Sequence, residues 1–120
     1  MPLIFYLLQK DPDMQLRIKI TALLGSRRSP DVTRALVGAL KDQEPDVRLA
    51  ALRAIEKIGD YSVAPALAGG PLKDQEESVR LQALKTLNAL QERRLAEIEA
   101  SRQQYEKEKQ KAALEAAKKR

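Results

Sequence analysis

One short signal occurs three times in the chain and constrains the fold more than any other feature. The three copies read KDPDMQLR from Lys10, KDQEPDVR from Lys41 and KDQEESVR from Lys73, at offsets of 31 and 32 residues. Each copy keeps Lys-Asp, four further residues, an aliphatic residue and Arg. Self-similarity at a fixed period of roughly 20–50 residues is typical of repeat proteins, in which each copy is one supersecondary unit. The chain is therefore predicted to be an array of three similar units.

Helical patterns flank each copy of the signal. Downstream of it, apolar residues recur at spacings of three and four, which is the stripe of an amphipathic helix. The stripes are Leu16, Ile20, Leu23 and Leu24; Val47, Ala50, Ala51, Ala54, Ile55 and Ile58; and Val79, Ala83, Leu84, Leu87 and Leu90. Upstream lies a shorter apolar helix, expected over residues 2–9, 31–40 and 62–68. Ser29 or Asp31 is expected to cap the second of these short helices, and Ser62 the third.

Each unit is thus a short helix, a tight turn and a longer helix. Neither helix can bury its apolar stripe alone, so neighbouring units must stack into one continuous core. The predicted fold is all-α: a short α-solenoid of about three helical hairpins over residues 1–90, with repeats at about 1–28, 29–60 and 61–90. The composition agrees, because the chain is rich in Ala, Leu, Glu, Lys and Arg and has only four aromatic residues.

The last 30 residues differ in character from the repeats. Residues 91–120 contain no Gly or Pro and consist largely of strong helix formers, which predicts a long, charged, solvated C-terminal helix from Leu81 onward. Leu95, Ile98, Tyr105 and Ala112 come closest to a heptad seam, but Arg102 and Lys109 interrupt it. Residues 91–120 are therefore predicted to be a separate helical tail.

The second and third units carry a family resemblance. LKDQEPDVRLAALRAIEKIGD followed by SVAPAL resembles the HEAT-like repeat found in phycobilin lyase subunits and in bacterial and archaeal scaffold proteins. The resemblance implies a non-catalytic protein–protein interaction module whose longer helices line a concave face that binds a partner protein. It also implies a turn Asp and a longer-helix Arg that orient the repeats. The corresponding residues are Asp11 and Arg17, Asp42 and Arg48, Asp74 and Arg80 for the Asp/Arg pairs, and Arg53, Glu56, Gln82 and Lys85 for the concave face.

Two features depart from a regular array. Gly69-Gly70-Pro71 breaks the short helix of the third unit, which predicts either an early helix end followed by a loop or a notch that admits a partner. The opening helix PLIFYLL is apolar nearly all round, although an end repeat normally turns a polar face to water. Leu3, Phe5 and Tyr6 are therefore a second candidate partner-binding surface, unless the array is longer.

Several classes of chemistry lack their usual residues. The chain has no Cys and no His, so it has neither a thiolate metal site nor the usual acid–base group near neutral pH. It contains no Gly-rich phosphate loop and no Gly-x-Ser-x-Gly motif. We expect no catalytic, cofactor or metal site. The apolar opening is too short to span a bilayer, and the cytoplasm is the expected compartment.

Two alternatives to a partner-binding scaffold stay open. The apolar opening helix and the Leu95, Ile98 and Tyr105 edge predict a self-assembling structural subunit, a homo-oligomer. The basic tip Lys118, Lys119 and Arg120 suggests nucleic-acid binding, which is less favoured because Glu106, Glu108 and Glu115 alternate with the lysines. The net charge of +5 is spread thinly, since residues 1–90 carry 13 basic and 11 acidic side chains.

Overall fold

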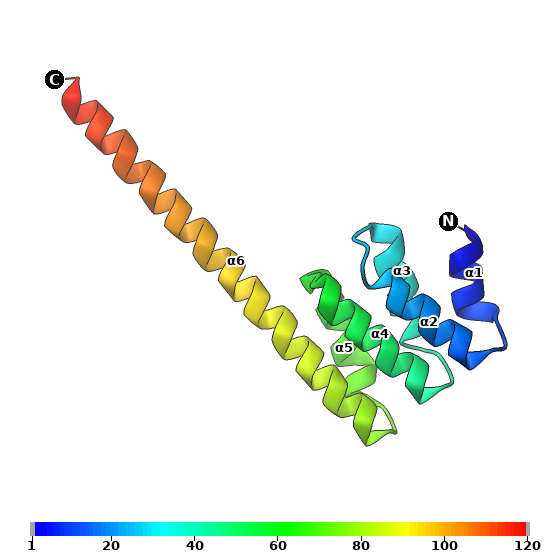
Figure 1. Cartoon of the computed structure of the whole chain (residues 1–120). Coiled ribbons are helices and arrows are strands. Elements are labelled where there is room, and N and C mark those ends of the chain that lie inside the picture. Colours follow the sequence, from blue (N-terminus) through cyan, green and yellow to red (C-terminus); the bar gives the residue numbers. More distant parts are fainter. Residues whose placement is uncertain (1, 120) are drawn as a thin grey trace. The chain divides into compact units, whose positions relative to one another are not determined.

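A computed structural model of the chain describes residues 2–119. Within these residues it contains six α-helices, two 3-10 helices and no strand, which confirms the predicted all-α class (Figure 1). In chain order the elements are α1 (Pro2–Lys10), α2 (Met14–Leu24), α3 (Pro30–Ala39), α4 (Pro45–Ile58), the 3-10 helix η1 (Tyr61–Val63), α5 (Ala64–Gly69), the 3-10 helix η2 (Pro71–Lys73) and α6 (Glu77–Lys118).

Local signals explain most of the helix ends. The Ser29 side chain accepts a hydrogen bond from the backbone N–H of Val32, so Ser29 caps α3. Gly59 ends α4 in the left-handed conformation, with φ of 74°, which favours glycine. The expectation that Ser62 caps the third short helix was wrong. The carboxylate of Asp60 caps the preceding 3-10 helix η1 by accepting from the N–H of Ser62, and α5 itself has no side-chain cap.

The glycines of the third unit shorten its first helix. α5 ends at Gly69, and the chain continues directly as the 3-10 helix η2, in which Pro71 is buried. The early helix end is therefore observed, and a 3-10 turn takes the place of the expected loop. The long helix α6 begins at Glu77, before the predicted start at Leu81.

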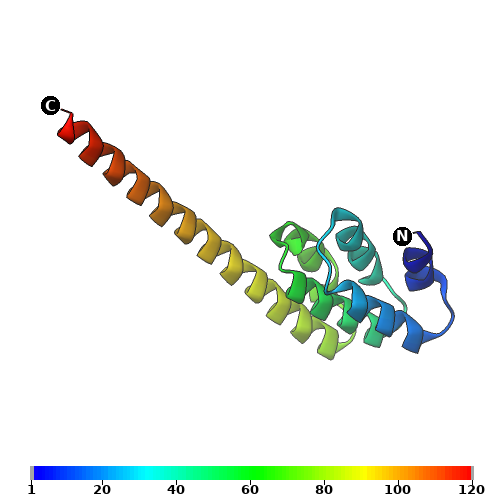
Figure 2. The ribbon, with the colours of Figure 1, turned by 45° about the horizontal axis from the view of Figure 1, so that its top comes forward.

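The helices of residues 2–90 form two rows. α2, α4 and the beginning of α6 lie side by side, and α1, α3 and α5 lie on the other side of them (Figures 1 and 2). Each repeat thus contributes one helix to each row, as stacked helical hairpins do. We call the longer second helix of each repeat its B helix: α2, α4 and residues 77–90 of α6.

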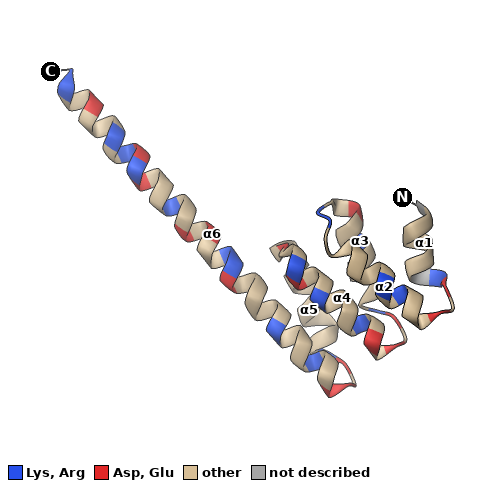
Figure 3. Cartoon of the chain, in the orientation of Figure 1, with Lys and Arg blue, Asp and Glu red and all other residues tan. Residues whose placement is uncertain are grey.

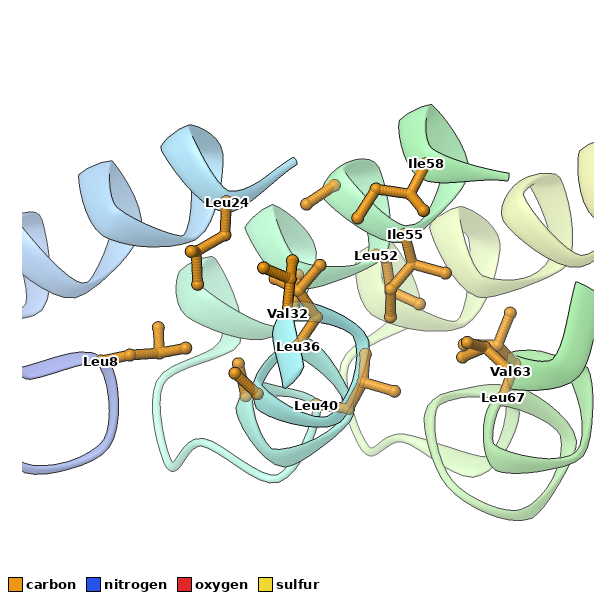
Figure 4. Close-up of a cluster of buried hydrophobic side chains, with 14 of the residues drawn as sticks. Leu8, Leu24, Val32, Leu36, Leu40, Leu52, Ile55, Ile58, Val63 and Leu67 are labelled. Carbon is orange, nitrogen blue, oxygen red and sulfur yellow. The ribbon is translucent and has the colours of Figure 1, made fainter. Parts of the chain in front are cut away.

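One apolar cluster fills the space between the two rows. Leu8 and Leu24 come from the first repeat, and Leu36, Leu52 and Ile55 come from the second (Figure 4). The cluster continues into the third repeat through Val63, Leu67, Val79 and Leu90. Full burial of each Leu or Ile side chain contributes about 1.5–3 kcal/mol, so this shared interior is the main source of stability.

Two residues of the predicted apolar stripes are not in the core. Leu23 is 64% exposed and Leu84 is 50% exposed. The position equivalent to Leu84 in the second repeat is Leu52, which is fully buried at 0%. Leu23 belongs to the first repeat and Leu84 to the third. Both therefore lie in the end repeats of residues 1–90 and remain exposed.

Packing divides the chain into two units, Met1–Leu90 and Gln91–Arg120. In the second unit, residues 91–119 are helical as far as Lys118 and are exposed throughout. Local pairs one turn apart support this helix, including the ion pair of Glu99 and Arg102 and the hydrogen bond between Gln104 and Glu108. No described helix is both long and apolar enough to cross a lipid bilayer.

Candidate interaction surface

An arginine at the start of each B helix connects its repeat to the next one. The Arg17 guanidinium donates from Nε to Asp42 Oδ2 at 3.0 Å and from Nη2 to Asp42 Oδ1 at 3.3 Å. Its Nη1 donates to the backbone carbonyl of Asp11 at 2.6 Å. One guanidinium therefore fixes the turn of its own repeat and binds the turn carboxylate of the following repeat.

The second and third repeats are joined in the same way. Arg48 Nε lies 2.7 Å from Asp74 Oδ2, and Nη2 donates to Oδ1 at 3.1 Å. Arg48 Nη1 donates to the carbonyl of Asp42 at 2.7 Å. A planar guanidinium matches a carboxylate in two places, which fixes orientation as well as distance.

Each turn aspartate has a second role within its own turn. Asp42 Oδ1 accepts from the N–H of Glu44 at 2.9 Å, and Asp74 Oδ1 accepts from the N–H of Glu76 at 2.9 Å. Burial alone would raise the pKa of Asp74, but the Glu76 N–H and the Arg48 guanidinium outweigh it and hold that pKa below its ordinary value. The carboxylate is thus held in its ionised form.

The series of pairs is incomplete at both ends. Arg80 donates from Nη1 to the carbonyls of Asp74 and Gln75, and no carboxylate in residues 2–119 forms an ion pair with it. Asp11 accepts from the N–H of Asp13 at 2.9 Å, and no described arginine side chain pairs with its carboxylate. The two unfilled positions lie at opposite ends of the stack.

A partly buried polar contact joins the B helices of the second and third repeats. Glu56 Oε1 accepts from Gln82 Nε2 at 3.3 Å and from Thr86 Oγ1 at 3.1 Å. Glu56 and Gln82, predicted to face a partner, therefore bind one another between two repeats. Thr86 is fully buried, and the sequence analysis did not identify it. Its position within an otherwise apolar stripe was the available signal.

Arg53 and Lys85 are exposed on adjacent B helices. Lys19 and Lys57, which the sequence analysis did not identify, are exposed on the same row of helices. Lys19, Ala22, Leu23, Ser26 and Lys57 line a shallow hollow of about 490 Å³. The exposed carboxylates of these B helices, Asp46 and Glu77, lie in the first turns of α4 and α6 (Figure 3).

Comparison with known proteins agrees with this geometry. A family model described as HEAT repeats matches residues 1–88. The chain belongs to the HEAT-repeat family. HEAT repeats generally serve as protein-interaction scaffolds and are generally non-catalytic. No curated protein matches the chain.

The other predicted surfaces of this HEAT-repeat protein are divided between exposed and packed residues. In the first HEAT repeat, Leu3 and Tyr6 are exposed at 69% and 62%, whereas Phe5 packs against the core. In the tail, Leu95, Ile98 and Tyr105 are all exposed. Lys118 and Lys119 are exposed, and Arg120 lies outside the described residues. No group of three or more acidic side chains within residues 2–119 is arranged to hold a metal ion.

Proposed function

We propose that the three HEAT repeats are a non-catalytic module that binds a partner protein on the B-helix face. We define this face as the exposed residues Lys19, Ala22, Leu23, Arg53, Lys57 and Lys85. One observation carries the proposal: four exposed cations lie on three adjacent helices, and two of them, Lys19 and Lys57, line a shallow hollow together with the exposed Leu23. Basic side chains around an apolar anchor form an arrangement that recognises a segment of opposite charge.

The composition of the face defines the partner. Leu23 is exposed and lines a shallow hollow together with Lys19 and Lys57. An amphipathic helix with an apolar residue for this hollow and carboxylates on either side matches the surface. The Glu56 carboxylate is half-buried between α4 and α6, where it accepts from Gln82 and Thr86.

The charge of the face is local. Residues 1–90 carry 13 basic and 11 acidic side chains, so long-range attraction of a polyanion is weak. Binding therefore depends on charge pairs at short range. Salt already screens attraction beyond a Debye length of about 8 Å at physiological ionic strength, and more salt shortens that length further. We expect the affinity for an acidic peptide to fall as salt rises, with a residual apolar contribution from Leu23.

Photo-crosslinking from the face tests the proposal. A photoreactive amino acid at Ala22 is used to capture partners in the native extract, and mass spectrometry identifies them. Binding of the identified protein is then measured for Arg53→Glu/Lys85→Glu. The matched control is Lys107→Glu/Lys111→Glu, which makes the same charge change on the exposed tail.

The proposal predicts that charge reversal on the B helices weakens binding at least about tenfold, since close charge pairs at an interface can be worth about 1.5 kcal/mol or more. Charge reversal on the tail should leave the affinity within about twofold of the wild type. Equal effects of the two reversals, or no effect of either, would refute the B-helix face as the binding surface.

A further inference from the structure

The contacts between the second and third repeats show how one repeat receives the next. Three residues of α4 contact the third repeat: Arg48 and Glu56 through their side chains, and Leu52 through its backbone carbonyl. Arg48 pairs with Asp74, the Leu52 carbonyl lies 3.4 Å from Thr86 Oγ1, and Glu56 accepts from Gln82. These contacts define an outgoing face on one repeat and an incoming face on the following one.

Moving each contact by one repeat identifies the uncovered faces. The equivalents of Arg48, Leu52 and Glu56 at an offset of 32 residues are Arg80, Leu84 and Asn88, which we call the outgoing face. The same alignment carries Asp74, Thr86 and Gln82 to the first repeat. Their equivalents are Asp11, Leu23 and Lys19, which we call the incoming face.

The end-face leucines differ in solvent exposure from the equivalent residues between the second and third repeats. Leu52 and Thr86 are fully buried, while Leu84 and Leu23 are 50% and 64% exposed. Arg17 and Arg48 each bind a carboxylate of the following repeat, and Arg80 binds only backbone carbonyls. Leu84 meets water where the second repeat buries Leu52, and Leu23 meets water where the third repeat buries Thr86, so both are surfaces prepared for a neighbour.

The two faces match each other pair by pair. Arg80 would meet Asp11, which repeats the charge pair seen twice inside the chain. Leu84 would meet Leu23, which places apolar surface against apolar surface. Asn88 would meet Lys19, whose ammonium can donate to the Asn88 side-chain carbonyl. The three positions that lack a partner on one face therefore have complementary residues on the other.

We propose that the outgoing face of the third repeat docks onto the incoming face of the first repeat in a second copy of this chain. The Arg–Asp series then continues from one molecule to the next, and the apolar core gains a contact at each junction. The interface is heterologous, because the two surfaces differ, so it generates open stacks or closed rings rather than an isologous dimer. Self-assembly in this form does not use the exposed residues of α1 or of the tail.

Sedimentation velocity of the full chain tests the stack. The average mass of the wild type should rise with concentration through the micromolar range. Leu84→Glu blocks the outgoing face and Leu23→Glu blocks the incoming face, and each should weaken self-association about tenfold or more by burying a carboxylate against leucine. Both leucines are exposed, so both variants should fold, which their circular dichroism spectra verify.

Mixing the two variants gives the sharpest result. Leu84→Glu keeps an intact incoming face and Leu23→Glu keeps an intact outgoing face, so one native junction can form between them. The other possible junction joins the two mutated faces, and the two introduced glutamates would repel each other there. The mixture should therefore produce a 1:1 dimer that does not grow. A head-to-head or tail-mediated dimer would not arise selectively from this mixture.

Charge reversal supplies the matched control. Arg80→Glu should weaken the stack about tenfold or more, whereas Lys107→Glu, the same charge change on the exposed tail, should leave it unchanged. A wild type that stays monomeric at all concentrations would overturn the proposal. So would assembly that neither Leu84→Glu nor Leu23→Glu affects, or a mixture of the two that remains monomeric.

Discussion

The Arg17–Asp42 pair gives the strongest test of how the repeats hold together. The two side chains are 6% and 9% exposed, so Asp42→Ala leaves a buried guanidinium whose Nε and Nη2 have lost their acceptor. Removing one partner of a buried ion pair costs about 3–5 kcal/mol. The N–H of Glu44 loses its acceptor as well, which adds about 1 kcal/mol.

Asp11→Ala is the matched control. Asp11 occupies the same turn position in the first repeat and accepts from the N–H of Asp13, but no arginine within residues 2–119 forms an ion pair with it. Its substitution should cost only about 0.5–1.5 kcal/mol. The difference of about 3–5 kcal/mol between the two variants isolates the contact between repeats. It is a large share of the roughly 5–15 kcal/mol by which a domain is stable.

Urea denaturation followed by circular dichroism at neutral pH measures both variants, in dilute solution so that self-association does not contribute. A further substitution sharpens the test: adding Arg17→Met to Asp42→Ala should recover part of the lost stability, because it removes the uncompensated charge. If Asp42→Ala and Asp11→Ala are equally destabilised, the arginine does not couple the first two repeats and the reasoning fails.

Two further predictions concern packing and pH. Gly25→Ala should destabilise the fold by about 1–3 kcal/mol, since the new Cβ would lie 3.0 Å from Ala54 Cβ. Gly69→Ala has open space around it and should be neutral or stabilising by up to about 1 kcal/mol. Urea denaturation measures both variants. Because the folded-state pKa of Asp74 lies below its ordinary value of 3.8, its contribution to stability is complete well above 3.8 and is lost as pH falls from there through the lower folded-state pKa. Acid titration of the urea midpoint should show this loss in the wild type and a smaller loss in Asp74→Asn; equal losses would contradict it.

The repeat period made most of the fold predictable from the sequence. The repeated Lys-Asp signals indicated where each repeat lies, and apolar residues at spacings of three and four predicted the B helices from the sequence alone. The HEAT-like resemblance also indicated the Asp and Arg positions that the structure brings together in two inter-repeat pairs. These features depend on local sequence and on a rule that each repeat obeys independently.

Sequence-based prediction was less successful for residues whose burial or pairing depends on whether an adjacent repeat packs against them. A helical stripe shows that Leu23 and Leu84 lie on the apolar side of their helices. It cannot show whether another repeat packs against that side. In the same way, Glu56 and Gln82 look like surface residues on their own helices, and only the stacking of α4 against α6 brings them into contact. Their pairing depends on the distance between two helices, which no single helix encodes.

The side-by-side arrangement of the three B helices is the central claim, and a distance between the outer two tests it directly. The chain has no cysteine, so Ala22→Cys/Lys85→Cys can carry two spin labels at exposed, equivalent positions of the first and third repeats. Helices pack at interaxial distances of 8–10 Å, so double electron–electron resonance should give one narrow distribution centred on roughly 20 Å plus the reach of the labels. A broad distribution extending to much longer distances would show that the three helices do not lie in one row and would contradict the account.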